Sequence, residues 1–251
     1  MKFDIANYTC NGGHEINEDS FLVLEDMFIV ADGLGGHDNG EVASACAIRC
    51  FQESVCAEYT KESIMEMLET AHKAVQDLNS PARTTVAASF ISGDFFYYAN
   101  VGDSRIYYFK KDKLFAQSRD HSVCQAAVDV GTMTYEEIRT SEDRSRLLKV
   151  LGNEGDLNLK KLYDPILMED GDAFIICSDG FWEFVYEGEM ETDLLKSDTA
   201  EEWMNYMLKR QLLRAKNEDD NYTVICGIIH EEKQKKTIEK KWFGLFKKHN
   251  R

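Results

Sequence analysis

Short runs rich in β-branched and aromatic residues recur along this chain, and they constrain its fold more than any other feature. Several are joined by close turns, at 25–26, 92–94 and 110–113, a spacing typical of antiparallel hairpins. Around ten strands are too many for a repeating β-α-β unit. The expected strands are Phe3–Thr9, Phe21–Leu24, Met27–Ala31, Thr84–Ile91, Phe95–Val101, Arg105–Phe109, Leu114–Gln117, Leu157–Tyr163, Ala173–Cys177 and Tyr222–Ile229.

Helical patterns form groups of their own. Gly40–Glu58 and Lys61–Leu78 interrupt the strands early, and Thr199–Ala215 precedes the last strand. Separate groups predict an α+β fold in which two antiparallel sheets pack face to face, with helices on both outer faces. We expect one domain over residues 1–230. The polar stretch after Gln117 contains a candidate lid, at about 122–149, or a plain surface excursion.

Charge is distributed unevenly. The formal net charge is -16, yet residues 231–251 hold eight Lys or Arg against three Glu. The acidic body argues against nucleic acid as a partner. In the basic tail, an apolar group falls on one side at helical spacing, flanked by lysines. The tail is a disordered extension, docks on an acidic partner or on the body itself, or contacts a membrane surface; its apolar residues are Trp242, Phe243, Leu245 and Phe246.

Cysteine usage indicates the compartment. The seven cysteines form no CxxC pair and no zinc-like spacing, so we expect reduced core residues. The N-terminus has no apolar signal region, and no 18 uninterrupted apolar residues occur. We therefore expect a cytoplasmic protein, with the tail as its link to any membrane surface.

Acidic pairs stand at the edges of the predicted strands, far apart in the sequence: Glu18-Asp19, Asp32-Gly33, Asp179-Gly180 and Asp220-Asn221. A surface turn explains any one of them, but turns explain the whole set poorly. Carboxylates forced together repel one another and have raised pKa values, unless divalent cations lie between them. The chain therefore predicts a site for hard metal ions.

These pairs belong to a longer ordered series: Asn17-Glu18-Asp19, Asp32-Gly33-Leu34-Gly35-Gly36-His37, Thr84-Thr85, Val101-Gly102-Asp103-Ser104-Arg105, Asp120-His121-Ser122, Cys177-Ser178-Asp179-Gly180 and Asp220-Asn221. Over residues 1–230 the series resembles the metal-dependent protein phosphatases of type 2C (PPM family), most closely their compact bacterial members. The resemblance implies hydrolysis of phosphoserine and phosphothreonine in proteins by water activated at a binuclear Mn²⁺ or Mg²⁺ centre. It also implies phosphoprotein substrates and a cognate Ser/Thr kinase in a signalling circuit.

The resemblance assigns metal ligands by position. Asp32 would bridge the two ions, and the Gly33 carbonyl would bind one of them. Asp179 and Asp220 would hold the other ion. Ligands of this kind, without nearby cysteine, suit Mg²⁺ or Mn²⁺ better than Zn²⁺.

Further residues would support these ions. Glu18 and Asp19 would orient bound waters, and Thr85 would hydrogen-bond within that shell. Some relatives have a weaker third ion, whose site here would be lined by Asp103, and after it Asp120 or Glu183. A turn residue is the alternative for Asp103.

The part of the predicted site that would bind the substrate phosphate departs from the family pattern. Relatives usually carry an arginine at the position of His14, where a guanidinium forks onto phosphate, and imidazole offers a single donor. We hypothesise that protonated His14 contacts the phosphate or gives a proton to the leaving serine; a plain turn residue is the alternative. Arg83, close to Thr85, either replaces the missing cation or faces solvent.

A second function stays open because of this departure: a catalytically weak PPM-fold module with a regulatory binding role. Retention of three mutually repelling aspartates favours the enzyme. Phosphatases of tyrosine, of small molecules or of an anti-sigma antagonist share the chemistry and also stay open.

Overall fold

Two antiparallel sheets pack face to face in the computed structural model, which describes residues 1–35, 39–78, 80–159, 162–215 and 219–231. The first sheet has the order β1-β11-β10-β7-β8, and the second has the order β2-β3-β5-β6-β9, with β4 paired to β3. The strands are β1 Lys2–Cys10, β2 Asp19–Val23, β3 Met27–Leu34, β4 Arg83–Thr84, β5 Val86–Ser92, β6 Phe95–Val101, β7 Arg105–Lys110, β8 Lys113–Gln117, β9 Ile166–Leu167, β10 Ala173–Cys177 and β11 Tyr222–His230.

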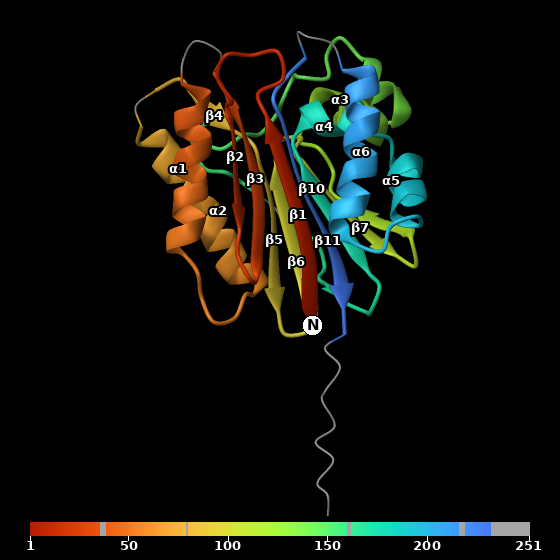
Figure 1. Ribbon diagram of the computed structural model, residues 1–251. Coiled ribbons are helices and arrows are strands. Elements are labelled where there is room, and N and C mark those ends of the chain that lie inside the picture. Colours follow the sequence, from red (N-terminus) through yellow and green to blue (C-terminus); the bar gives the residue numbers. More distant parts are fainter. Residues whose placement is uncertain (36–38, 79, 160–161, 216–218, 232–251) are drawn as a thin grey trace, which may run out of the picture.

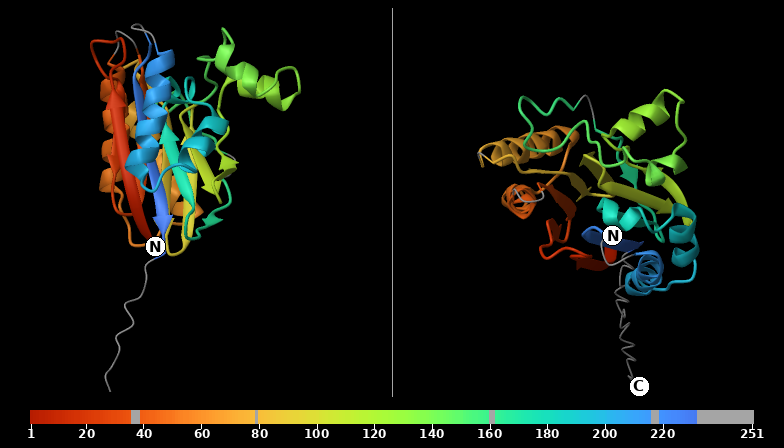
Figure 2. Two further views of the ribbon diagram at one scale, coloured as in Figure 1. Left: turned by 45° about the vertical axis from the view of Figure 1, so that its right-hand side comes forward. Right: turned by 90° about the horizontal axis from the view of Figure 1, so that it is seen from above.

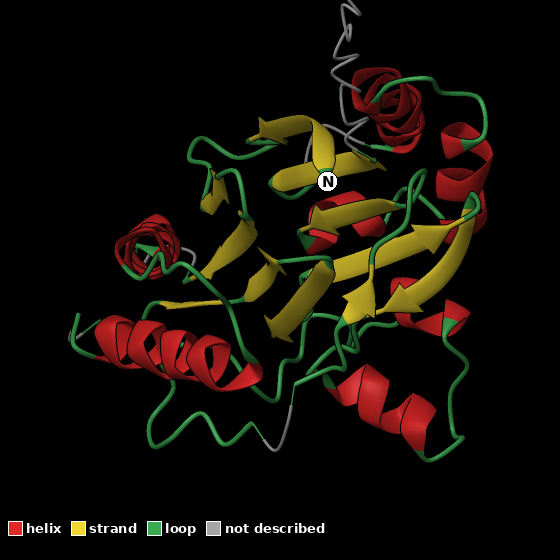
Figure 3. Ribbon diagram, turned by 90° about the horizontal axis from the view of Figure 1, so that it is seen from below, coloured by secondary structure: helices red, strands yellow, loops and turns green. Residues whose placement is uncertain are grey.

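Helices cover both outer faces, as the end-on view in Figure 3 shows. Helices α1 (Gly40–Glu53) and α2 (Lys61–Gln76) lie on the second sheet, and α5 (Glu187–Leu194) and α6 (Ala200–Arg214) lie on the first (Figure 1). The short helix α4 (Asp179–Trp182) follows β10 directly. The predicted α+β sandwich with helices on both outer faces is confirmed.

Burial on both faces explains why the central strands read as continuous apolar runs. In β3, Met27 and Ile29 pack with the helices, while Phe28 and Val30 enter the layer between the sheets. Strand β10 divides its side chains in the same way, because Phe174 lies in the inter-sheet layer and its neighbours face α6. Each of these central strands is therefore buried on both faces, one against the helices and the other against the opposite sheet.

Two predicted elements differ from the structure. No strand occurs in the described residues of Leu157–Tyr163; Leu157 and Leu162 pack on the core beneath α2, and Tyr163 donates its hydroxyl to Asn100. Helix α1 ends at Glu53 instead of residue 58, because the chain turns to bury Tyr59 against Phe90, with ring centroids 5.1 Å apart. The described residues of both segments are held in place by the packing of single apolar side chains, without regular secondary structure.

The polar stretch after Gln117 contains α3 (Val123–Asp129) and the 3-10 helix η2 (Glu136–Thr140), which project from the sandwich in Figure 2. Hydrogen bonds close its base, from Val123 N to Arg146 O at 2.9 Å and from Leu148 N to His121 O at 2.7 Å. The predicted lid at 122–149 occupies this projecting segment. Tail residues 232–251 lie outside the described part of the chain.

Membrane-spanning helices were also sought. Among the described residues, none of the helices combines the length and apolar character needed to cross a bilayer.

Candidate metal centre

Asp19 and Asp32 lie directly opposite each other in the β2-β3 ladder. Like charges in directly opposed positions destabilise a sheet, so this pairing needs a compensating cation or protonation. Asp179 begins α4 immediately after β10, and Asp220 immediately precedes β11. In Figure 1, β1 ends, β11 begins and α4 lies at the upper end of the sandwich.

Burial and mutual repulsion raise the pKa values of the central carboxylates. Burial raises the pKa of Asp32 well above its ordinary range, and the charges of Asp179 and Asp19 raise it further. The pKa of Asp179 is likewise raised by burial, then by Asp103 and Asp220. These reciprocal effects show that residues from four separate segments form one electrostatic cluster.

The margin of the cluster has the same character. Burial raises the pKa of Asp103 to about 7, and burial raises that of Asp19 to about 6 against hydrogen bonds that lower it. For Glu18, burial raises the pKa, followed by the nearby charge of Glu41. Such a concentration of raised carboxyl pKa values marks a functional site more often than a structural one.

Two carboxylate oxygens in the cluster have no protein partner. Asp19 Oδ1 and Asp179 Oδ1 are buried and make no hydrogen bond within the described residues. A buried oxygen without a donor is costly, and a divalent cation or its bound water would satisfy it. The donor set of carboxylates without cysteine fits Mg²⁺ or Mn²⁺.

The side chains do not form a closed cage by themselves. No group of three Asp, Glu, His or Cys side chains in the described ranges is arranged to hold a metal ion. Backbone carbonyls and waters would therefore have to supply part of the coordination, as hard cations commonly accept. The Gly33 carbonyl is a predicted contributor of this kind.

Thr85 fixes the backbone of Asp32. Thr85 N donates to Asp32 O at 2.8 Å, and Asp32 N donates to Thr85 Oγ1 at 3.1 Å. Thr84 Oγ1 donates to the same Asp32 carbonyl at 2.8 Å. The role expected for Thr85, hydrogen bonding within the site, takes the form of anchoring the central aspartate through its main chain.

Glycine at position 33 is required by a close approach of backbones. A Cβ built there would lie 2.2 Å from the carbonyl oxygen of Gly40 and 2.6 Å from that of Glu18. The Gly33 amide donates to Glu18 O at 3.1 Å. Because Gly33 needs no Cβ, the start of α1 and the Glu18 segment can both contact the end of β3.

Asn221 is a site residue to which the sequence assigned no role. Its Oδ1 accepts from Glu18 N at 2.7 Å, and its Nδ2 donates to Asn11 O at 2.9 Å. It thus clamps the loop before β2 to the start of β11, across 203 residues of sequence. Its position directly after Asp220 was the available signal.

Ser178 is a second residue of this kind. Its hydroxyl donates to Asp19 Oδ2 at 2.8 Å and accepts from Thr223 N at 2.9 Å. One Asp19 oxygen is therefore occupied, which leaves only Oδ1 free to face an ion or water.

His14 contacts the cluster from solvent. Its Nε2 lies 3.6 Å from Asp220 Oδ1, and both side chains are more than half exposed, at 54% and 62%. The contact puts imidazole at the mouth of the site, and a phosphate-binding role for His14 stays a prediction.

Arg83 points elsewhere. Its guanidinium donates to the carbonyl oxygens of Ser80 and Ala82, at 2.9 and 2.8 Å, and to Asn153 Oδ1 at 3.3 Å. These acceptors engage Nε and Nη1, so the geometry disfavours Arg83 as the replacement cation.

Arg144, in the projecting segment, is a better-placed cation to which the sequence assigned no phosphate-binding role. Its Nε donates to Glu183 Oε1 at 2.7 Å. Glu183 raises the pKa of Arg144, and the more distant charges of Asp179 and Asp220 add to this, so the guanidinium lies near the cluster. The only sequence signal was an arginine within the predicted lid.

The candidates for a third ion have different surroundings. Asp120 forms a buried two-point ion pair with Arg105, so its oxygens are occupied. Glu183 is held by Arg144. Asp103, 4% exposed and electrostatically coupled to Asp179, is the candidate whose carboxylate belongs to the cluster.

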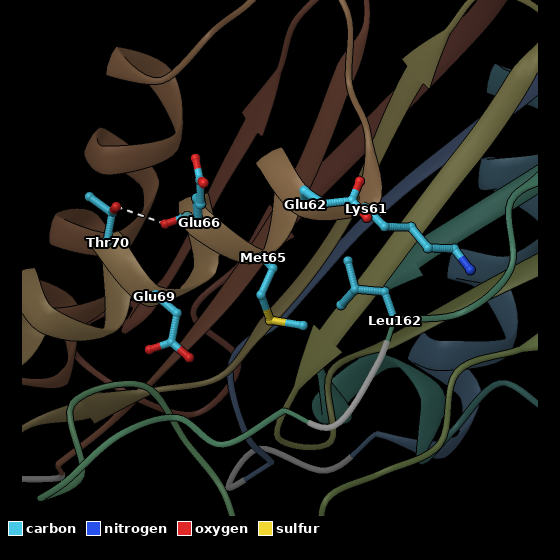
Figure 4. A pocket seen from close by; sticks show the side chains of 7 residues that line it. All are labelled: Lys61, Glu62, Met65, Glu66, Glu69, Thr70 and Leu162. Carbon is cyan, nitrogen blue, oxygen red and sulfur yellow. Dashed lines mark hydrogen bonds between the residues drawn. The ribbon is translucent and has the colours of Figure 1, made fainter.

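A surface pocket beside α2 lies away from this cluster. Its volume is about 810 Å³, and Figure 4 shows Met65 and Leu162 facing each other across it, with Glu62 and Glu69 beside them. It contains none of the predicted site residues.

Comparisons with known proteins agree with this geometry. The family described as Protein phosphatase 2C matches residues 13–219. A relative called serine/threonine phosphatase stp from Listeria welshimeri is 32% identical over 201 residues, covering 74% of this chain and 77% of the relative. Its counterpart from Listeria innocua is 29% identical over 229 residues, covering 86% of this chain and 87% of the relative.

A solved structure supports the fold. The catalytic domain of the serine/threonine protein phosphatase PstP, in complex with two manganese ions, superposes with a TM-score of 0.78 at 22% identity. The alignment covers 91% of this chain and 99% of that domain.

Proposed function

This chain belongs to the protein phosphatase 2C family, and we propose that it hydrolyses phosphoserine and phosphothreonine in proteins with Mn²⁺ or Mg²⁺. The observation that carries this proposal is the buried carboxylate cluster with two oxygens left without protein donors. When bound, two divalent ions lower the pKa of a shared water and neutralise phosphate oxygens.

The surroundings of these residues support the predicted ligand roles. Asp32, locked by Thr85 and buried between the other carboxylates, would bridge the ions. Asp179 would contribute its unpartnered Oδ1, and the more exposed Asp220 would hold the same ion from the solvent side. The Gly33 carbonyl would complete the set on the β3 side.

Asp19 and Glu18 act on water. Ser178 fixes one oxygen of Asp19, so the free Oδ1 has a single direction in which to accept from a water. The backbone of Glu18 is held by Asn221 and by Ser44, whose Oγ donates to Glu18 O at 2.6 Å. Pre-oriented acceptors remove the cost of organising a water nucleophile at the moment of attack.

Substrate phosphate would be held by His14 and Arg144. Both lie beside the carboxylates that would bind metal, and Arg144 offers the forked guanidinium that is missing at position 14. Its ion pair with Glu183, at 2.7 Å, anchors the guanidinium within electrostatic reach of Asp179 and Asp220. Arg144 would release Glu183 in part as phosphate arrives, because phosphate competes for the same donors.

The natural substrates would be phosphoproteins made by a cognate Ser/Thr kinase. A catalytically weak regulatory module is the competing function, and the loss of arginine at position 14 is the observation in its favour. Turnover numbers distinguish the two functions directly.

The deciding experiment measures Mn²⁺-dependent phosphate release from a phosphothreonine peptide, with phosphotyrosine and p-nitrophenyl phosphate as comparison substrates. Asp179→Asn should lose most activity, and Glu154→Gln, which changes an exposed acid that is not among the predicted site residues, serves as the matched control. Activity that survives Asp179→Asn or excess EDTA would refute the metal mechanism. Mn²⁺ binding without turnover would favour the regulatory module.

A further inference from the structure

The end of the sandwich opposite the carboxylate cluster is open. A groove of about 660 Å³ lies there between the two sheets. We call it the inter-sheet groove, and its apolar floor consists of Phe3, Ile5, Leu24, Phe28 and Ile91. These residues belong to or border the inter-sheet core, since Phe3 and Phe28 have ring centroids 6.0 Å apart. The groove is thus an uncapped end of the core.

Acidic turns surround this end. Glu25 and Asp26 line the groove itself. Backbone hydrogen bonds join the neighbouring turns to it, from Ile91 N to Asp26 O at 2.8 Å and from Met168 N to Asp94 O at 2.9 Å. The β9-β10 turn adds Glu169 and Asp170 at the same end. The rim of the apolar opening therefore carries acidic side chains together with two cations, Lys2 in the groove lining and Lys110, whose Nζ lies 3.6 Å from Glu169 Oε2.

The basic tail leaves the body at this opening. Strand β11 ends at His230, which pairs with Lys2, a residue that lines the groove. Glu231 N donates to Asp170 Oδ1 at 2.8 Å, so the departure point is fixed against the acidic turns. Figure 1 shows the end of β11 beside the start of β1 at the lower end of the molecule.

We propose that the chain's own segment 240–248, Lys-Lys-Trp-Phe-Gly-Leu-Phe-Lys-Lys, docks in the inter-sheet groove. Its aromatic and aliphatic side chains match the apolar floor, and its flanking lysines would pair with Glu25 and Asp26 in the groove lining. The fit is one of chemical type and order, apolar in the middle and charged at both ends.

Reach permits the docking. About ten residues separate Glu231 from Trp242, and a flexible linker of that length has an end-to-end distance of about 16–19 Å. A short tether gives an effective concentration of about 1 mM, so a segment with a free-peptide Kd of about 100 μM is docked about nine-tenths of the time. A weak intrinsic affinity is therefore sufficient.

The surrounding charge disfavours a membrane as the occupant. An anionic bilayer that met the tail at its point of departure would also meet Glu25, Asp26, Asp94 and Asp170, together with the cations Lys2 and Lys110, of which Lys110 pairs with Glu169. Lysines gain roughly 1 kcal/mol each near such a surface, and the carboxylates at the same end oppose that gain. The same carboxylates favour the tail when it folds back on its own body.

The test follows Trp242 in the full chain by acrylamide quenching, as the difference between the wild type and Trp242→Phe. Trp182 and Trp203 are 1% and 0% exposed, so they contribute little. We expect quenching of Trp242 to be about tenfold weaker than in the free peptide 238–251, given the docked fraction above. Protection should not depend on protein concentration.

Variants identify the surface. Glu25→Lys and, independently, reversal of Lys240, Lys241, Lys247 and Lys248 to Glu should each expose Trp242. Glu154→Lys, an exposed acid elsewhere, should leave it protected. The tail variant does not touch the folded body, so its result does not depend on the stability of the groove.

Three outcomes would overturn the proposal. Trp242 could be as accessible as in the free peptide. Its protection could grow with protein concentration, which would assign the segment to a second copy. The full chain could pellet with anionic vesicles when a chain ending at Glu231 does not, and Trp242 could be accessible when no vesicles are present. Together these results would assign the segment to a lipid surface. Phosphatase activity enters none of these readouts, so they are independent of the proposed function.

Discussion

The buried ion pair between Arg105 and Asp120 is expected to be a major determinant of stability. Arg105 Nε lies 2.8 Å from Asp120 Oδ1, and Arg105 Nη2 lies 2.6 Å from Oδ2. The two side chains are 0% and 1% exposed, and the guanidinium lies 3.4 Å above the Trp182 ring. Asp120→Asn preserves shape but leaves the Arg105 charge without its counterion in a dry site.

Breaking such a buried pair by changing one partner costs about 3–5 kcal/mol. For a domain of this size, each kcal/mol lowers Tm by about 2–4 °C, so Asp120→Asn should lower Tm by about 6–20 °C. The matched control is Asp143→Asn, whose pair with Arg146 is 53% and 68% exposed. Because an exposed pair contributes about 0–1 kcal/mol, the control should shift Tm by less than about 4 °C.

Thermal unfolding by circular dichroism measures both variants, and a Mn²⁺ titration of activity measures whether Asp120 binds metal. If Asp120 is structural, the Mn²⁺ concentration for half-maximal activity stays within about twofold of wild type once stability is controlled. Replacing both partners, as in Arg105→Met with Asp120→Leu, should cost less than Asp120→Asn alone. A small Tm change together with a severalfold higher Mn²⁺ requirement would refute the structural role and return Asp120 to the metal site.

Three more predictions concern the site. In excess EDTA, Tm should rise as the pH falls from about 8 to 5.5, because burial raises the pKa of Asp103 to about 7 and that of Asp19 to about 6, and a carboxyl group with a raised pKa destabilises the fold once it ionises. Saturating Mn²⁺ should reduce or reverse this trend. A Tm of the EDTA-treated protein that falls over the same range would contradict the cluster. Arg83→Ala should leave KM for a phosphopeptide within about twofold, because its guanidinium is committed to backbone carbonyls; a large KM increase would restore it as the phosphate cation. Gly33→Ala should abolish Mn²⁺ binding, measured by calorimetry, and lower Tm, because the new Cβ would lie 2.2 Å from Gly40 O. The control Gly188→Ala, which has open space around it, should leave Tm unchanged or raise it slightly.

Local patterns in the sequence were sufficient for most of the fold. Strands such as Phe95–Val101 and Ala173–Cys177 coincide with the structure because apolar runs between turn residues leave few alternatives. The segment Leu157–Tyr163 shows the limit, because its apolar residues have the composition of a strand but bind the core singly. A strand needs a partner, and no local pattern reports whether one is present.

For the site, the sequence determined which residues would take part and which kind of ligand they would bind. Four acidic pairs at strand edges require a cation wherever the fold brings them together, and this follows from charge repulsion alone. The sequence also indicated the departure at His14, since the type of residue at one position is visible without structure.

Only the tertiary structure decided how these side chains are committed. It paired Asp120 with Arg105, turned Arg83 toward carbonyl oxygens, and brought Arg144 from the projecting segment close to Asp179. Each decision depends on partners that lie 15 or more residues away or on the local path of the backbone. The sequence specifies which hydrogen bonds and ion pairs each side chain is able to form. Long-range packing selects the partner, because hydrogen-bond and ion-pair energies depend on distances that the fold alone sets.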